Sequence, residues 1–174
     1  MSRHALLAIG RDRPGIVAAV TGVLLRHDVN VEDSQMTILR GHFTMMLVLA
    51  VPDSAEIGAL SRELAELEAL EGLSLGAVED TRPGPEPSHI VTVYGADHMG
   101  IVHAVSSALA ERQIDITDLN SRLLEEEGTP LYVLMLEVAL PPGGSPDELG
   151  SGLAEVGGHE GVQVTLRELD RDEL

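Results

Sequence analysis

A glycine-containing stretch that occurs twice constrains the fold of this chain more than any other feature. Residues 10–17 read GRDRPGIV, and residues 95–102, 85 positions later, read GADHMGIV. An apolar run precedes each copy and an apolar-periodic segment follows it, which is the pattern of a strand, a turn and a helix. Because the repeat spans about half of the 174 residues, the sequence predicts two related domains.

The segment after each turn predicts a helix and then a strand at the edge of a sheet. Apolar residues fall on one helical stripe in both copies, and these are expected in the core: Ile16, Val20, Val23 and Leu24, and Ile101, Val105, Ala108 and Leu109. The strands that follow begin at Val29 and Ile114 and change their apolar phase midway. A phase change requires an extra residue, so bulges are expected near residues 32–35 and 117–120.

The remainder of each half completes the same plan. Near-continuous apolar runs at residues 42–51 and 131–140 predict central strands. Capping-box patterns at Asp53–Glu56 and Ser145–Glu148 predict second helices, and alternating residues at 73–77 and 162–166 predict last strands. Each half therefore reads βαββαβ, an α+β ferredoxin-like unit, with domains at 1–81 and 88–174 and a Pro/Gly linker at 82–87.

Composition excludes several classes of function. The 11 basic residues, all arginines, stand against 29 acidic ones, giving a net charge of −18, so direct binding of nucleic acid is disfavoured. The chain has no cysteine, which excludes thiolate metal sites and a cysteine nucleophile. We find no membrane-length apolar stretch and no signal-peptide pattern, and therefore expect a cytoplasmic protein.

No catalytic, metal or cofactor motif emerges from the sequence. His98 and His103 are five apart, with the first on the turn and the second on the helix, so they do not share a helical face. The turns lack the Gly-x-Gly-x-x-Gly and P-loop patterns of nucleotide sites. We expect no cofactor and a protein that is not an enzyme.

The turns themselves are the candidate site. The first helical N–H groups lack partners within the helix and favour negative charge, so a small carboxylate could bind there. Asp12 and Asp97 lie just upstream, and either caps these N–H groups or binds the ammonium of a ligand. Asn30 and Asp115 lie at the start of the second strands. Each either has a structural role at the end of the preceding helix or contributes to ligand binding.

The motif DRPGIV after a short strand, followed by an aliphatic helix and VNVEDS, resembles an ACT domain. The resemblance covers essentially the whole chain as two copies, and the tandem arrangement is similar to the glycine cleavage system transcriptional repressor family. The first copy also resembles the regulatory part of formyltetrahydrofolate deformylases. ACT domains commonly bind amino acids where the turn of one unit faces the second strand of its neighbour.

The resemblance implies a set of ligand-binding residues and a mode of action. Carried over, the set is Asp12, Arg13, Gly15, Ile16, Asn30 and Val31 with Asp97, His98, Gly100, Ile101, Asp115 and Ile116. It also implies a joint eight-stranded sheet with helices on one face, a homodimer, and regulation by contact with a partner protein such as a transcription factor. The differences Pro14/Met99 and Arg13/His98 leave open whether both turns bind a ligand.

We therefore expect a regulator that senses a small metabolite, most simply an amino acid, and passes its state to a partner protein. The alternative is a structural interaction module, or a detached regulatory subunit of a folate or amino-acid enzyme, whose turns are only helix caps.

Overall fold

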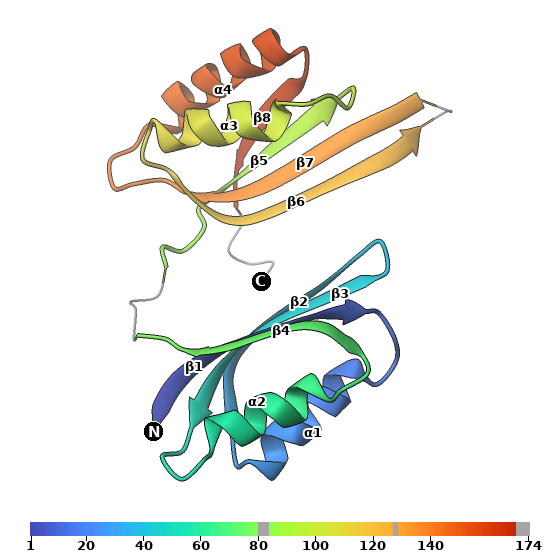
Figure 1. Ribbon diagram of the computed structural model, residues 1–174. Helices are drawn as coiled ribbons and strands as arrows, with labels where there is room; N and C mark the ends of the chain where they lie inside the picture. Colours follow the sequence, from blue (N-terminus) through green and yellow to red (C-terminus); the bar gives the residue numbers. More distant parts are fainter. Residues whose placement is uncertain (80–83, 127–128, 170–174) are drawn as a thin grey trace. The chain divides into compact units, whose positions relative to one another are not determined.

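The computed structural model describes residues 1–79, 84–126 and 129–169, and the chain divides into two compact units, Met1–Arg82 and Pro83–Leu174 (Figure 1). Part of the expected linker at 82–87 lies outside the described residues. Because each unit has its own sheet and its own core, the two are described separately.

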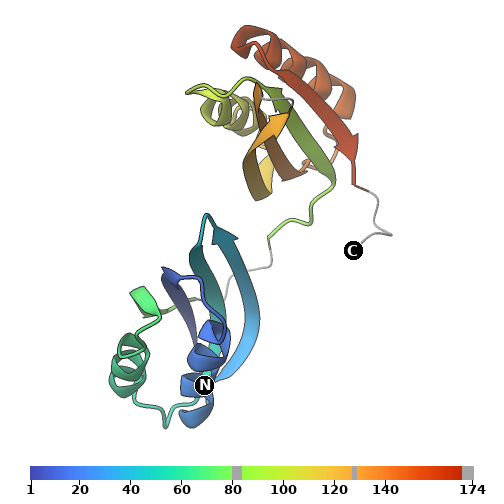
Figure 2. The same ribbon diagram turned by 90° about the vertical axis from the view of Figure 1, so that its right-hand side faces the viewer.

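Both units have the predicted βαββαβ order. The first contains β1 (Ser2–Arg11), α1 (Ile16–Arg26), β2 (Asn30–Leu39), β3 (His42–Val51), α2 (Ile57–Ala65) and β4 (Leu70–Ala77). The second contains β5 (His89–Gly95), α3 (Ile101–Ala110), β6 (Asp115–Glu126), β7 (Thr129–Ala139), α4 (Pro146–Glu160) and β8 (Gln163–Glu168). Within each unit both helices cover one face of the sheet (Figures 1 and 2). The predicted ferredoxin-like α+β fold is confirmed.

The strands form two antiparallel sheets of four, in the orders β2-β3-β1-β4 and β6-β7-β5-β8. The resemblance implies that two such sheets join into a single sheet of eight strands. The joining of units edge to edge stays a prediction about assembly. The apolar strands β3 and β7 are central, as their sequences predict.

The edge strands β2 and β6 carry the predicted bulges. The register of β2 against β3 shifts between Val31 and Asp33, and that of β6 against β7 shifts between Ile116 and Asp118. After the shift Met36 pairs with Met45 and Ile38 with Phe43, so β2 turns these side chains toward the helix-covered face.

The cores are aliphatic, and the predicted helical stripes are buried. In the first unit Ile16, Val20, Val23 and Leu24 pack with β3 and with Leu60 and Leu64 of α2 around Phe43, the one phenylalanine of the chain. Ile101, Val105, Ala108 and Leu109 hold the same places in the second unit. The stripes are therefore core and not a binding surface.

The first glycine of each repeated turn lies where another backbone segment or side chain approaches closely. A Cβ on Gly10 would collide with the carbonyl of Ala69. A Cβ on Gly95 would lie 2.6 Å from Cγ1 of Val162. Both positions therefore exclude a side chain, because contacts below 3.0 Å require the neighbour to move.

The two capping-box predictions have different outcomes. Ser145 caps α4, accepting a hydrogen bond from the Glu148 N–H at 3.3 Å, with Pro146 at the first helical position. The prediction for Asp53 is wrong: α2 begins at Ile57 after Glu56, which makes no side-chain cap. Asp53 instead pairs with the amino terminus at 2.9 Å, because the chain between it and α2 forms a turn of its own.

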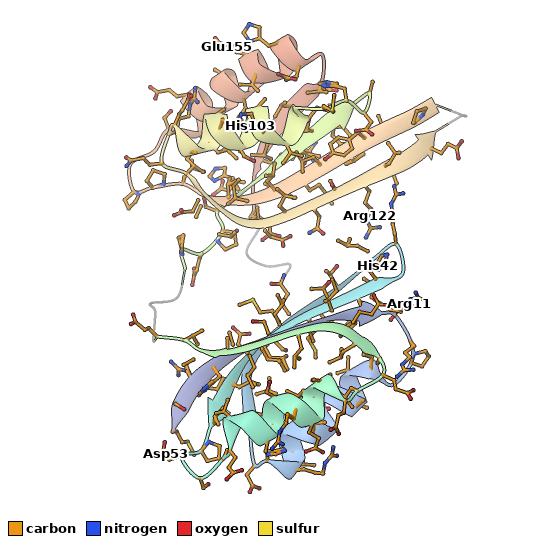
Figure 3. All side chains as sticks on the ribbon, viewed as in Figure 1. Arg11, His42, Asp53, His103, Arg122 and Glu155 are labelled. Atoms are coloured by element: carbon orange, nitrogen blue, oxygen red, sulfur yellow. The ribbon has the colours of Figure 1, made fainter. Side chains whose placement is uncertain are left out.

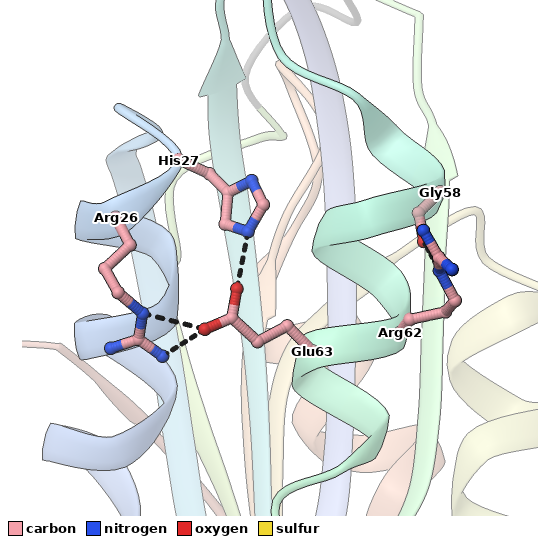
Figure 4. A network of polar contacts seen from close by, with 5 residues as sticks. All are labelled: Arg26, His27, Gly58, Arg62 and Glu63. Atoms are coloured by element: carbon pink, nitrogen blue, oxygen red, sulfur yellow. Dashed lines mark hydrogen bonds and ion pairs between the residues drawn. The ribbon is translucent and has the colours of Figure 1, made fainter.

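A polar network joins the two helices of the first unit (Figure 4). Glu63 of α2 accepts hydrogen bonds from Arg26 at the end of α1, with Nε at 2.7 Å, and its second oxygen lies 2.7 Å from Nε2 of His27. The hydrogen bonds from Arg26, and then from His27, hold the pKa of Glu63 below its ordinary value of 4.5. The network fixes the carboxyl end of α1 against α2.

Candidate functional site

The turn after β1 places a left-handed glycine directly before α1. Gly15 has a φ of 91° and is the residue before the helix, so Pro14 lies ahead of the cap and not in the first helical turn. The first i to i−4 bond runs from the Ala19 N–H to the Gly15 carbonyl at 2.8 Å. The N–H groups of Val17 and Ala18 precede that bond, so the helix itself offers them no i−4 carbonyl partner.

Asp12 does not cap this helix. Gly15 occupies the cap position, and no side chain accepts a hydrogen bond there. The backbone N–H of Asp12 donates to the carbonyl of Gly41 at 2.9 Å, which ties the turn to the β2–β3 hairpin. Within the described part of the chain, the carboxylate of Asp12 and the guanidinium of Arg13 make no hydrogen bond or ion pair. The capping interpretation of Asp12 is therefore wrong, because the helix begins too far downstream.

A cavity of about 480 Å³ lies beside this turn, and we call it the turn pocket. It is lined by Asp12, Arg13, Gly15, Ile16, Val17, Ala18, Thr21, Met36 and Phe43. Phe43 is fully buried beneath it, whereas Met36 of β2 is 47% exposed. Arg11 and His42, which pair in the β1–β3 ladder, lie at the end of the sheet from which the turn leaves (Figure 3). The pocket thus combines two unpaired charges with an apolar lining.

Four of the twelve predicted ligand residues line this pocket: Asp12, Arg13, Gly15 and Ile16. Sequence reasoning missed the contribution of Met36 and Phe43. The signal was present, because the phase change in β2 moves Met36 to the face on which Phe43 lies. Identifying the pair also requires the β2–β3 register, which the bulge sets.

The second turn has the same backbone but different contacts. Gly100 has a φ of 108° and precedes α3, again without a side-chain cap, so the capping interpretation of Asp97 is also wrong. The ring of His98, the counterpart of Arg13, is engaged within the unit: Nδ1 lies 3.0 Å from the Met99 carbonyl and Nε2 lies 2.8 Å from the Glu160 carbonyl. Ile101 is buried beneath the turn, at 1% exposed.

The predicted residues on the second strands lie far from the turn of their own unit. Asn30 pairs with Ala50, which in turn pairs with Arg3, whereas the turn follows Arg11. Eight residues of strand correspond to about 27 Å. Asp115 and Ile116 likewise pair with Ala139 and Val138, at the far end of β7 from the second turn. These three residues, with Val31 of β2, remain predictions that require a neighbouring unit.

The described residues contain no cluster of three or more His, Cys, Asp or Glu side chains that could hold a metal ion. None of the helices in the described ranges has the length and apolar character to cross a membrane. The acidic run Glu125–Glu127 extends outside the described residues, as does the charged carboxyl end.

Two βαββαβ units, each with a glycine turn before its first helix, define a tandem ferredoxin-like protein. The sequence profile of the ACT domain matches residues 6–77. The UPF0237 protein of Methanopyrus kandleri is 40% identical over 65 residues, covering 37% of this chain and 72% of that protein. The UPF0237 protein of Pyrobaculum aerophilum is 37% identical over 79 residues, or 45% and 83% of the two chains. The chain belongs to the UPF0237 family, and its residues 6–77 form an ACT domain.

Solved structures extend the similarity to the tandem arrangement. A crystal structure of an unknown protein from Galdieria sulphuraria has a TM-score of 0.78 at 26% identity, covering 97% of this chain and 99% of that one. The crystal structure of a candidate glycine cleavage system transcriptional repressor has a TM-score of 0.72 at 18% identity, covering 98% of both chains. The second likeness shows the tandem ACT fold alone.

Proposed function

We propose that this protein is a non-enzymatic regulator that binds a free amino acid in the turn pocket and signals to a partner protein. The observation that carries the proposal is the pair Asp12 and Arg13, which stand unpaired at a cavity beside a helix amino terminus. The carboxylate suits an ammonium group. The guanidinium and the N–H groups of Val17 and Ala18 suit a carboxylate.

The lining of the pocket favours an amino acid with an apolar side chain. Ile16, Val17, Met36 and Phe43 present hydrocarbon and a thioether, and the volume of about 480 Å³ falls within the range of small-ligand sites. Bound glycine, which has no side chain, would leave this apolar surface in contact with water. We therefore expect valine, leucine or methionine to bind more tightly than glycine or serine.

Signalling requires that the ligand prefer one state of the protein. The predicted neighbour residues Asn30 and Val31 lie away from their own turn, so a ligand bridging a turn and a neighbouring second strand would favour the assembled state. The likeness to a candidate repressor favours a transcription factor of glycine or amino-acid metabolism as the partner. The net charge of −18 supports contact with a protein instead of DNA. We further propose that the protein acts as a homodimer in the cytoplasm.

The proposal is tested by thermal unfolding of the full chain with a panel of glycine, serine, valine, leucine and methionine. A ligand that binds only the folded state adds about 2.7 kcal/mol at a hundred times its Kd. We expect a saturable increase in Tm with at least one apolar amino acid. If no amino acid shifts the transition, the alternative of a structural interaction module without a ligand is favoured.

A further inference from the structure

The ring of His98 lies between two backbone carbonyls, and this geometry dictates its protonation. Nδ1 is 3.0 Å from the Met99 oxygen, and Nε2 is 2.8 Å from the Glu160 oxygen. A carbonyl oxygen only accepts hydrogen bonds, whereas neutral imidazole carries a single N–H. Both contacts are therefore hydrogen bonds only when the ring is the doubly protonated imidazolium.

The surroundings of the ring favour the same state. Glu160 is the last residue of α4, so its carbonyl belongs to the unpaired, negative end of that helix. The Glu160 carboxylate lies 3.9 Å from Nδ1, and Asp97 is the neighbouring charge on the turn. His159, the other titratable group in the last turn of α4, is exposed. Every charged group that acts on the ring is thus an anion.

These hydrogen bonds raise the pKa of His98 above its ordinary value of 6.5. The bond to Met99 contributes most, followed by the bond to Glu160, while partial burial opposes them. The His98 side chain is 38% exposed, so solvent can remove the proton. The first copy has Arg13 here, a side chain that does not lose its proton in proteins.

We propose that His98 is a proton-dependent latch, which orders the second turn against the carboxyl end of α4 with two hydrogen bonds when protonated and keeps at most one of them when neutral. The two copies of the turn have thereby diverged. The first keeps an unpaired arginine beside an open pocket, whereas the second is closed by a side chain that responds to pH. Raising the pH through the titration of His98 removes one of the two hydrogen bonds and loosens residues 96–100 from α4.

The experiment uses the full chain, with NMR of the histidine rings and amide hydrogen exchange across a pH series. In the wild type we expect the ring of His98 to titrate above 6.5, the ordinary pKa of histidine. Protection at Ala104 and Val162, whose N–H groups bond to Gly100 and Gly157, should fall about tenfold as His98 loses its proton, after correction for intrinsic exchange.

Three variants separate the latch from a general effect of pH. His98→Arg has a side chain that stays charged, so the protection of Ala104 and Val162 should stay high at every pH of the series. In His98→Gln the protection of these two amides should be low at every pH. In His103→Gln it should fall with rising pH as it does in the wild type. The proposal is overturned if His98 titrates at or below 6.5, or if protection in His98→Gln changes with pH as it does in the wild type.

Discussion

Gly15 connects the repeated motif to the proposed ligand site through its backbone. Its φ of 91° lies in the left-handed region, and a Cβ there would meet nothing within 4 Å, so the requirement for glycine is conformational and not steric. That conformation turns the chain from β1 into α1 and leaves the first helical N–H groups open toward the pocket.

Gly15→Ala should therefore destabilise the first unit by about 1 kcal/mol. Gly22, in the middle of the same helix, has ordinary helical geometry, with its nearest contact at 3.8 Å. Gly22→Ala should stabilise the unit by about 0.5 to 1 kcal/mol. Urea unfolding of both variants checks the pair, and the same sign for both substitutions would contradict this explanation of Gly15.

Glu63 gives the first unit a specific pH dependence. Its pKa is depressed by Arg26 and His27, so the stabilisation is present above about pH 4.5 and is lost as the pH falls through the lower folded value. We expect the urea midpoint of the wild type to fall more steeply below about pH 4.5 than that of Glu63→Gln. Glu68→Gln, at an exposed position, is the matched control and should follow the wild type.

At the scale of elements, the order of strands and helices could be predicted because the spacing of apolar residues and the turn residues between segments indicate it. The bulges of β2 and β6 followed from a change of apolar phase, and the edge position followed from the bulges. Helix starts were harder to predict. Asp53 and Asp12 are good capping residues by type, but a cap depends on where the helix begins, which tertiary packing decides.

The unequal outcome for the two capping boxes gives a test. Ser145→Ala should destabilise the second unit by about 1 kcal/mol, because the Glu148 N–H loses its acceptor. Asp53→Ala should cost less than about 0.5 kcal/mol, since its ion pair with the amino terminus is exposed. Urea unfolding followed by NMR signals of each unit measures both, and an equal loss for the two variants would contradict the assignment of the caps.

At the scale of the whole molecule, duplication gave two copies of the turn that precedes the first helix of each unit. The side chains of the two copies now differ. The sequence repeat located the turns, but the turn pocket depends on Met36 and Phe43 meeting across a bulged ladder, and the engagement of His98 depends on Glu160, 62 residues away. Neither long-range contact has a local signature in the sequence. A net charge of −18 acts at the same scale and disfavours direct binding of nucleic acid.

Isothermal titration calorimetry of three proteins tests whether the first turn binds an amino acid through Asp12. With the amino acid that most raises Tm, the wild type and Asp97→Ala should bind with similar Kd. Asp12→Ala should bind at least about tenfold more weakly. The unfolding midpoint of Asp12→Ala should be unchanged, because the carboxylate caps no helix. Binding by Asp12→Ala as tight as that of the wild type would contradict the account.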